Sequence, residues 1–375
     1  MENIEIRFPP NHNEVIIPDA KIKIIGVGGA GTNAITRMIT ANITGVTLYA
    51  VNTDNGSLKK SAAENRISIG TGLGVGGDPV KGKQYAEEAV DKFRDMLQGA
   101  NMAFITTGMG GGTGTGAAPV IARVSKELGI LTVGVVTRPF TAEGSERVEN
   151  AKTGIAELRE YTDALIVIPN DRIFTLVDEK THYEKGFEVI DDVLRRAIES
   201  ITDTITKTGT VNIDFADVKG VLSDADNAII GLGDGQTFEE AFKNAITNKF
   251  VEGEDIVDAH KILINISYSN INEIAIGDIK YAYDYCAKEF KHYKSLKVGN
   301  IENNELDTKI RVAIIASFKK ENIKDTSKED EDPLGLFKNK EVPDEKNKNK
   351  KIEETKKEED VFSKPAYEIH RPTRL

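Results

Sequence analysis

From Asn101 to Pro119 the chain reads NMAFITTGMGGGTGTGAAP, the most informative stretch of the sequence. Its first half is an apolar, β-branched run typical of a buried strand, and its second half, from Gly108, is a glycine-rich loop. Each glycine weakens a helix or strand by up to about 1 kcal/mol relative to alanine, so this many indicate that the backbone approaches something closely. Successive amides can form an anion-binding concavity, to which Thr113 and Thr115 add hydroxyl donors. We expect a helix to begin after Thr115, with its positive end towards the anion and Pro119 in its first turn.

Two further glycine loops precede this one. Gly26, Gly28 and Gly31 satisfy G-x-G-x-x-G directly after the apolar run KIKIIGVG, which favours either a phosphate site at a helix N-terminus or tight strand-to-helix packing without a ligand. The segment TGLGVGGDP, from Thr71 to Pro79, is by itself typical of a flexible turn. No lysine follows the third loop as a P-loop requires, so the predicted phosphate site is built from backbone amides.

Strand and helix patterns alternate around these loops, which predicts an α/β fold with a Rossmann-like parallel sheet. Apolar residues at three- and four-residue steps predict a long central helix from Phe187 to Lys207, ended by Gly209. We expect an N-terminal arm over 1–20, a first domain over 21–209 and a smaller α+β second domain over 210–318. The expected strands are KIKIIGVG, TLYAVNTD, NMAFITTGM, ILTVGVVTRP and ALIVIPND in the first domain and KILINISYS and KIRVAIIASF in the second.

The C-terminal part has a different composition. Residues 319–360 are rich in lysine, glutamate and asparagine and too poor in apolar residues to offset the entropy of ordering them, so we predict a disordered charged linker. Residues 361–375, VFSKPAYEIHRPTRL, contain aromatic, proline and arginine residues and are either a docking peptide or an ordinary frayed terminus.

Composition excludes several classes of protein. The formal net charge of -11 predicts that the chain as a whole repels nucleic acid and anionic lipid. The single cysteine, Cys286, excludes an internal disulfide, and the scattered histidines give no metal-ligand spacing, so no protein metal site is expected. No run reaches the roughly 18 apolar residues of a membrane span, and the N-terminus lacks a signal-peptide pattern, so we expect a cytosolic protein.

The loop GMGGGTGTGAAP resembles the signature loop of the tubulin and FtsZ superfamily. The chain from about Ile22 to Phe318 is similar to the bacterial FtsZ branch of that superfamily, through GVGGAGTNAI, VNTD, TGLGVGGDP, TRPFTAEGSER, VIPND, FEVIDDVL and NIDFADVKGVLSDAD in the same order. The resemblance implies a GTPase that polymerises head-to-tail into protofilaments of the cytokinetic ring, in the cytoplasm at mid-cell. It also implies that the C-terminal peptide binds membrane-tethering and regulatory division proteins, without direct membrane insertion.

The resemblance further implies a GTP or GDP site. Asn33 and Asp191 would read the guanine edge with Phe187 packed on the ring, and a carboxylate at Asp191 can accept from both the ring N–H and the exocyclic amine of guanine, a pair of donors that adenine lacks. Thr137 and Pro139 would line the sugar. The phosphates would be held by Gly28, Gly29, Gly110, Gly111, Gly112, Thr113, Gly114 and Thr115, and Glu143 and Arg147 would contact the ribose or phosphate region.

By the same resemblance, Asn212, Asp214 and Asp217 would form a catalytic loop that acts on the GTP of the adjacent subunit. Carboxylates permanently beside a triphosphate would be repelled, whereas a partner can deliver them together with Mg²⁺. Hydrolysis would therefore be switched on by assembly.

Two alternatives remain open from the sequence. G-x-G-x-x-G followed by Asp54 also fits an NAD-dependent oxidoreductase, although that class gives the second and third glycine loops and the acidic loop no role. The second alternative is a divergent nucleotide-binding filament protein without efficient turnover. The presence of Asn212, Asp214 and Asp217 argues against this alternative.

Overall fold

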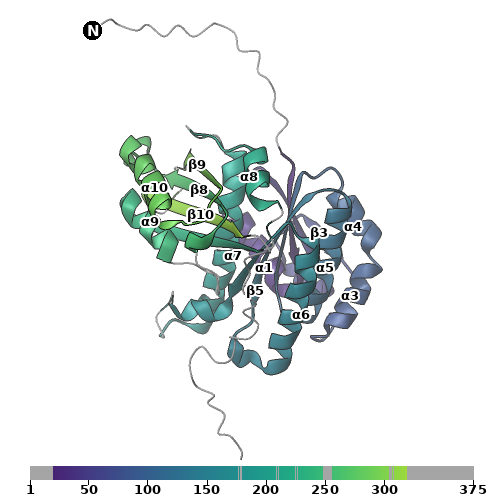
Figure 1. The fold of residues 1–375 in the computed structure, drawn as a ribbon. Coiled ribbons are helices and arrows are strands. Elements are labelled where there is room, and N and C mark those ends of the chain that lie inside the picture. The colour runs from purple at the N-terminus through teal and green to yellow at the C-terminus, as the bar shows by residue number, and fades with distance from the viewer. Residues whose placement is uncertain are drawn as a thin grey trace, which may run out of the picture. The chain divides into compact units, whose positions relative to one another are not determined.

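The computed structural model describes most of the chain between Ala20 and Phe318, all of it within the unit Met1–Lys324 (Figure 1). The predicted linker over 319–360 and the C-terminal peptide over 361–375 lie outside the described residues, as does the N-terminal arm except for Ala20. The described residues are 20–175, 177, 180–207, 209, 211–223, 225, 227–247, 256–303, 306 and 308–318.

The first sheet is six-stranded and parallel, in the order β3-β2-β1-β4-β5-β6. Apart from the edge strand β3, its strands are short, mainly apolar runs, as expected of a sheet that helices cover on both faces. The bounds are β1 Ile22–Val27, β2 Val46–Asn52, β3 Asn65–Ser68, β4 Met102–Gly108, β5 Leu131–Arg138 and β6 Ala164–Pro169.

Alternate side chains of each strand enter two different cores, because successive residues of a strand point to opposite faces. Ile24 belongs to one core and Ile25 to the other, and Phe104 and Ile105 repeat this pattern. Helices α1 (Gly28–Thr40), α2 (Asn55–Lys60) and α7 (Tyr183–Thr206) contribute to the first core. Helices α3 (Pro79–Glu87), α4 (Val90–Leu97), α5 (Gly112–Glu127) and α6 (Ser145–Tyr161) contribute to the second, and short 3₁₀ turns lie at η1 (Thr141–Glu143) and η2 (Asn170–Thr175).

The second sheet is four-stranded and mixed, in the order β7-β10-β8-β9, with β10 antiparallel to β7 and β8 and β8 parallel to β9. Cys286, in α10 (Ile276–Glu289), is a buried core residue, and this burial raises the pKa of its thiol to about 12. The elements are α8 (Phe215–Leu222), β7 (Asn227–Gly235), α9 (Phe238–Thr247), η3 (Ile256–Asp258), β8 (Lys261–Tyr268), η4 (Ile271–Glu273), α10 (Ile276–Glu289), β9 (Ser295–Glu302) and β10 (Ile310–Phe318).

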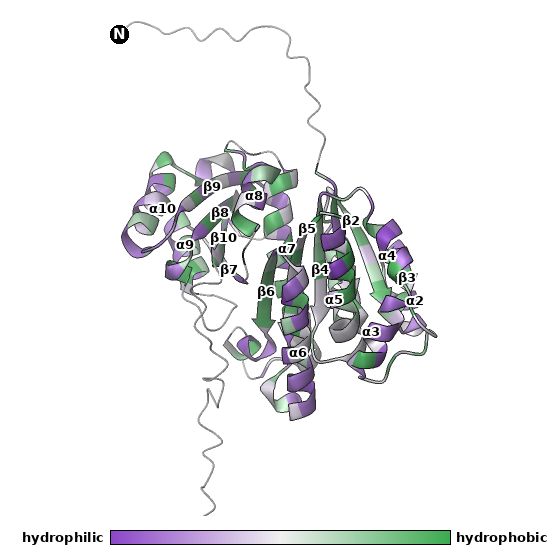
Figure 2. Ribbon diagram, turned by 45° about the vertical axis from the view of Figure 1, so that its right-hand side comes forward, coloured by the Kyte–Doolittle hydropathy of each residue, from purple (hydrophilic) through white to green (hydrophobic). Residues whose placement is uncertain are grey.

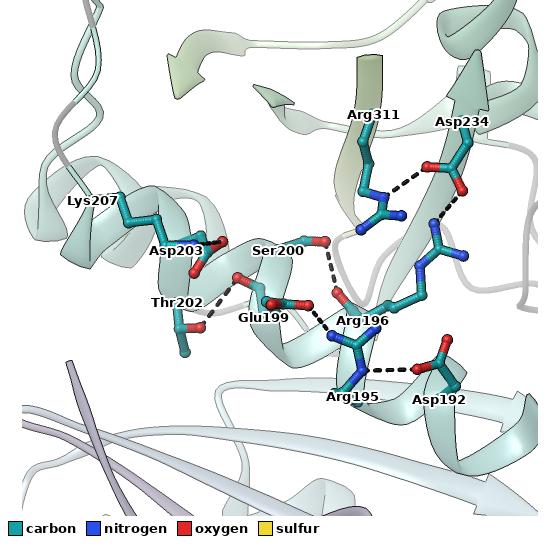
Figure 3. A network of polar contacts seen from close by, with 10 residues as sticks. All are labelled: Asp192, Arg195, Arg196, Glu199, Ser200, Thr202, Asp203, Lys207, Asp234 and Arg311. Atoms are coloured by element: carbon teal, nitrogen blue, oxygen red, sulfur yellow. Dashed lines mark hydrogen bonds and ion pairs between the residues drawn. The ribbon is translucent and has the colours of Figure 1, made fainter. Parts of the chain in front are cut away.

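The central helix α7 joins the two sheets through both apolar and polar contacts. The apolar core between α7 and the first sheet is continuous with the apolar core of the second sheet. Figure 2 shows apolar strands in both sheets and polar residues on the outer helices. Arg196 of α7 and Arg311 of β10 converge on Asp234 of β7, with 2.7 Å between Arg311 Nε and Asp234 Oδ1 (Figure 3). Nearer the end of α7, Asp203 pairs with Lys207 at 2.7 Å.

The structure confirms the predicted fold class and each strand that the sequence predicted, but it adds β3, β7 and β9. β3 has only four residues, and its polar, partly exposed side chains give no apolar run. β7 contains three glycines, which suggest a turn when read alone. A Cβ on Gly231 or Gly233 would lie 2.0 or 2.1 Å from a backbone oxygen of α9, so these glycines allow α9 to pack directly on the strand.

The expectation for Pro119 was wrong. Helix α5 begins at Gly112 rather than after Thr115, so Pro119 lies inside the helix and not in its first turn. Proline has no N–H to donate to the carbonyl of Thr115, and the helix continues through this lost bond because it is held in the second core. The central helix also differs from its predicted bounds, Phe187 to Lys207, since it begins at Tyr183 and ends at Thr206.

No helix within the described ranges is long and apolar enough to cross a lipid bilayer.

Candidate functional site

The first and third glycine loops lie side by side at the centre of the parallel sheet. β1 and β4 are neighbours, with Val27 opposite Thr107, and each strand leads through glycines into a helix. After β1 the chain continues to β2 on one side of this pair, and after β4 it continues to β5 on the other side. Open α/β sheets bind ligands at such a point, where the strand order reverses. Neither α1 nor α5 has a side-chain N-cap, so the first amides of both helices remain available to an anion.

Hydrogen bonds and close backbone contacts fix the two loops. The Gly110 amide donates to Thr115 Oγ1 at 2.8 Å, and Thr107 Oγ1 donates to the carbonyl oxygen of Val27 at 2.8 Å. Gly28 has a φ of +70°, and a Cβ there would lie 3.1 Å from the Gly114 nitrogen. Only glycine fits this position without strain, since both the backbone angle and the close approach exclude a side chain.

The second glycine loop packs against the third loop and is not an isolated turn. We call the surface formed by the three glycine loops the cradle. A Cβ on Gly112 would lie 2.4 Å from Val75 Cγ2 and 2.8 Å from the Asp78 nitrogen, so this loop packs against the start of α5. Positions for a Cβ on Gly29 and Gly111 have no neighbour within 4 Å and face open space. The three loops therefore pack together, with open space at Gly29 and Gly111, and the phosphate site stays a prediction.

Thr53 is a residue of the cradle that the sequence analysis did not single out. Its Oγ1 lies 2.6 Å from Thr113 Oγ1, which joins the end of β2 to the third loop. Asp54, the residue required by the dehydrogenase alternative, is instead bound within its own turn, where its carboxylate accepts from the Gly56 amide and from Ser57 Oγ. These bonds cap α2.

The residues predicted for the sugar lie beside Gly110. A Cβ there would lie 3.1 Å from Pro139 Cγ and 2.7 Å from the carbonyl oxygen of Arg147. Thr137 is buried at the end of β5, where its carbonyl oxygen accepts from the Met109 amide at 2.8 Å. Arg147 forms an ion pair with Glu143 at 2.8 Å.

Two of the three residues predicted for the guanine base line one cavity of about 560 Å³ between α1 and α7. Asn33 lies on α1 and Asp191 on α7. Phe187 lies one turn before Asp191, and its side chain is outside the described part of the chain. The cavity is lined by Asn33, Thr36, Arg37, Thr40, Ala41, Asp191, Asp192 and Arg195.

Arg37 is a further residue of this cavity that the sequence analysis missed. Its Nε lies 3.4 Å from Asp191 Oδ2. The available signal was spacing, because Arg37 is four residues after Asn33 and therefore on the same face of α1. Burial raises the pKa of Asp191 to about 6, and the charge of Arg37 opposes this rise. Asp191 is consequently ionised at neutral pH and can accept two hydrogen bonds from a guanine edge.

Of the three residues of the predicted catalytic loop, Asn212 and Asp214 lie between α7 and α8, and Asp217 lies in the first turn of α8. Asn212 Oδ1 accepts from the Gly209 amide at 2.7 Å, and Asp214 caps α8 by accepting from the Asp217 amide at 2.7 Å. Asp217 Oδ1 lies 2.8 Å from Lys297 Nζ on β9. The loop is thus locally ordered, with its acidic side chains partly exposed.

The loop and the cradle lie at opposite ends of the parallel sheet. From Asp191 to Thr206, α7 rises about 22 Å at 1.5 Å per residue. A Cβ on Gly45, just before β2, would lie 2.8 Å from Thr206, and the Ala225 amide donates to the carbonyl of Asp163, just before β6. Both contacts are at amino ends of strands, whereas the cradle is at carboxyl ends, and Figures 1 and 2 show α8 at the end where the chain enters β1.

Comparison with known proteins agrees with this geometry. Residues 21–178 match the GTPase domain of the Tubulin/FtsZ family. The chain is 39% identical over 322 residues to the cell division protein FtsZ of Rickettsia conorii, with 84% of this chain and 70% of that protein covered. The chain belongs to the Tubulin/FtsZ family. Its domain is therefore a GTPase domain of the tubulin and FtsZ type, and the dehydrogenase alternative is wrong.

Solved FtsZ structures share the fold. The chain superposes on an empty FtsZ dimer of M. jannaschii with a TM-score of 0.74 and 36% identity, covering 80% of this chain and 88% of that one. For a tryptophan-to-tyrosine mutant of M. jannaschii FtsZ the TM-score is 0.76 at 35% identity, with 82% and 94% covered. The CetZ2 protein of Haloferax volcanii, in a GTPγS-bound protofilament, has the same fold at 21% identity, with a TM-score of 0.68 and 79% and 92% covered.

Proposed function

We propose that this FtsZ-family protein is a GTPase that assembles head-to-tail into protofilaments of the bacterial cytokinetic ring, in the cytoplasm at mid-cell. The observation that carries the proposal is the position of the catalytic loop, at the opposite end of the subunit from the nucleotide cradle. One molecule therefore carries the cradle of one site and the catalytic loop of another. Stacking copies in one direction brings the loop of one copy to the cradle of the next.

In the proposed site, the amides of the three glycine loops hold the GTP phosphates, and Asp191 with Asn33 selects guanine. Thr137 and Pro139 lie against the sugar, beside Glu143 and Arg147. Asn212, Asp214 and Asp217 from the adjacent subunit orient and polarise the attacking water.

Mg²⁺ fits this arrangement as an ion carried by the nucleotide. Among the residues that the structure describes, no group of three or more His, Cys, Asp or Glu side chains could hold a metal ion by itself. Mg²⁺ usually keeps several waters and is bound by substrate phosphates with one or two carboxylates, which Asp214 and Asp217 of the neighbour could supply. Its charge would offset that of the phosphates.

Exposed apolar side chains at both ends support the contact. Leu73 and Val80, in and just after the second glycine loop, are 90% and 77% exposed, and Val211 beside the catalytic loop is 47% exposed. Large apolar side chains in these positions favour burial against another surface.

We further propose the organisation into a GTP-binding domain over 21–209 and a second domain over 210–318. The linker over 319–360 would connect them to the peptide over 361–375, which would bind membrane-tethering and regulatory division proteins.

GTP turnover per subunit, measured against protein concentration with parallel sedimentation, tests the proposal. We expect turnover to rise steeply where polymer appears, and Asp217→Ala to sediment with GTP while releasing little phosphate. A rate per subunit that is the same in dilute and concentrated protein would contradict an interfacial site. Polymer without phosphate release in the wild type would instead identify a filament protein without efficient turnover.

A further inference from the structure

Lys297 is a cation placed directly against the proposed catalytic loop. It lies near the start of β9, where its side chain is 46% exposed, and its Nζ is 2.8 Å from Asp217 Oδ1. The ion pair raises the pKa of Lys297, mainly through the hydrogen bond to Asp217, and the charge of Asp214 adds to the effect. This lysine is therefore charged throughout the physiological range.

The pair differs from two lysine–carboxylate pairs of the second domain that each lie on one helix, whereas Lys309 and Glu273 also pair across separate segments, at 3.7 Å. Lys243–Glu239 and Lys280–Asp284 each join neighbouring turns of one helix, and their side chains are all more than half exposed. Lys297 and Asp217 come from different elements and are held by the packing of α8 on the second sheet. Asp217 is also the less exposed partner, at 28%. A pair fixed by tertiary structure loses less side-chain entropy than a flexible helix-surface pair.

The pairing constrains the direction of the Asp217 carboxylate. Its amide is bound by Asp214 Oδ1 and its Oδ1 by Lys297. Within the described residues, Asp217 Oδ2 has no recorded hydrogen bond or ion pair. One oxygen is thus anchored, and the other remains available to a water or a metal ion outside the subunit.

We propose that Lys297 is a positioning residue of the GTPase site: it anchors Asp217 Oδ1 so that Oδ2 is presented to the nucleotide of the adjacent subunit. The inference rests on the proposed function. Lys297 also places a positive charge beside two carboxylates that must approach a triphosphate, which reduces the repulsion between the two halves of the site.

The test uses the full chain and compares Lys297→Met, Lys297→Arg and a matched control, Lys243→Met, which removes a lysine from an exposed pair. Turnover is measured at saturating GTP and divided by the amount of sedimented subunit, and the melting temperature is measured for each variant. We expect Lys297→Met to lower turnover per polymerised subunit about tenfold, with Lys297→Arg retaining most of it and Lys243→Met unchanged. Melting temperatures should stay close to the wild-type value.

A double-mutant cycle with Asp217→Asn separates positioning from a general charge effect. If Lys297 acts through Asp217, adding Lys297→Met to Asp217→Asn should produce little further loss. The inference would be overturned if Lys297→Met lowered turnover by the same factor in the wild type and in Asp217→Asn. It would also be overturned if Lys297→Met kept the wild-type turnover. Failure of Lys297→Met to sediment at a normal melting temperature would assign the lysine to the subunit contact and also overturn it. Concentration-independent turnover of the wild type would instead reject the proposed function itself.

Discussion

Asp191 shows how the surroundings of one residue set its chemistry. Burial raises the pKa of its carboxyl to about 6, and Arg37 at 3.4 Å limits the rise. A guanine ring that donates two hydrogen bonds to this carboxylate favours the ionised form. In the proposed site, nucleotide affinity and the protonation of Asp191 would therefore be linked.

We expect GDP to bind more weakly below pH 6, because protonated Asp191 cannot accept both guanine hydrogen bonds. At pH 5, one unit below the pKa, the loss should be about tenfold relative to pH 7.5. Titration calorimetry at the two pH values measures it. In Asp191→Asn the affinity should be low at both, and an unchanged pH dependence in that variant would assign the effect to another group.

Some glycines of the cradle allow close packing of the backbone, and others leave open space for the proposed phosphate. Substitution can separate these two roles. At Gly114 an added Cβ would lie 2.0 Å from Thr107 Oγ1, whereas at Gly29 it would meet no atom. Gly114→Ala should therefore lower the free energy of unfolding by about 1–3 kcal/mol through overpacking. Gly29→Ala, in α1, should raise the free energy of unfolding by up to about 1 kcal/mol, because alanine favours a helix over glycine. It should weaken GDP binding about tenfold, since its methyl group enters the space proposed for phosphate. Urea unfolding and GDP titration of both variants check this, and equal affinities of Gly29→Ala and wild type would remove Gly29 from the site.

At the scale of elements, α7 carries the candidate base pocket at one end and leads to the catalytic loop at the other. Between them, Arg196 of α7 pairs with Asp234 of the second sheet, which Arg311 also binds (Figure 3). Asp203, buried in this contact, has its pKa raised to about 6 by loss of hydration, although Lys207 opposes the rise. The helix thus contains a carboxylate that binds a proton more tightly in the folded than in the unfolded state.

The stability that Asp203 contributes is complete below about pH 4, its unfolded pKa, and is lost as the pH rises through 6. Relative to Asp203→Asn, the wild type should therefore gain about 1 kcal/mol in free energy of unfolding between pH 7 and pH 5. Urea unfolding of both proteins at the two pH values measures the difference. A gap between them that does not change with pH would contradict a raised pKa at Asp203.

At the scale of the whole molecule, the two ends of one subunit belong to two different proposed sites. Hydrolysis should then be possible between two variants that are each inactive with GTP. Asp217→Ala keeps the cradle and loses the catalytic carboxylate. Asp191→Asn keeps the catalytic loop and should prefer xanthosine triphosphate, because an amide donates to the second ring carbonyl of xanthine.

We expect a mixture of these variants, given labelled GTP and unlabelled xanthosine triphosphate, to release labelled phosphate, whereas neither variant alone does so. In the mixture, GTP held by Asp217→Ala meets the intact loop of Asp191→Asn. Random mixing at equal amounts should give about a quarter of the wild-type rate, since one contact in four combines these two ends. No labelled phosphate above the sum of the separate variants, in a mixture that sediments, would contradict a shared site.

Most of the fold could be predicted from local sequence. Most strands of the first sheet are apolar, β-branched runs, and the central helix has apolar residues at a regular helical period. The conformation of these elements can therefore be predicted from their own residues: β1, β2, β4, β5, β6 and α7. β3, β7 and β9 could not be found in this way. β3 is too short and polar, and β7 is recognisable as a strand only when α9 covers its glycines.

Local sequence was enough to predict a backbone phosphate site at the first and third glycine loops, because the glycines of each loop and the helix start that follows lie within a few residues of one another. The packing of the second loop against them, and the side chains that meet around the candidate sites, became visible in the folded structure. Arg37 and Asp191 are 154 residues apart, and Lys297 reaches Asp217 from another element. Such pairs depend on how helices and sheets pack, and no local pattern specifies them. The same packing places the catalytic loop and the cradle at opposite ends of the sheet, because α7 is rigid and about 22 Å of it separates them.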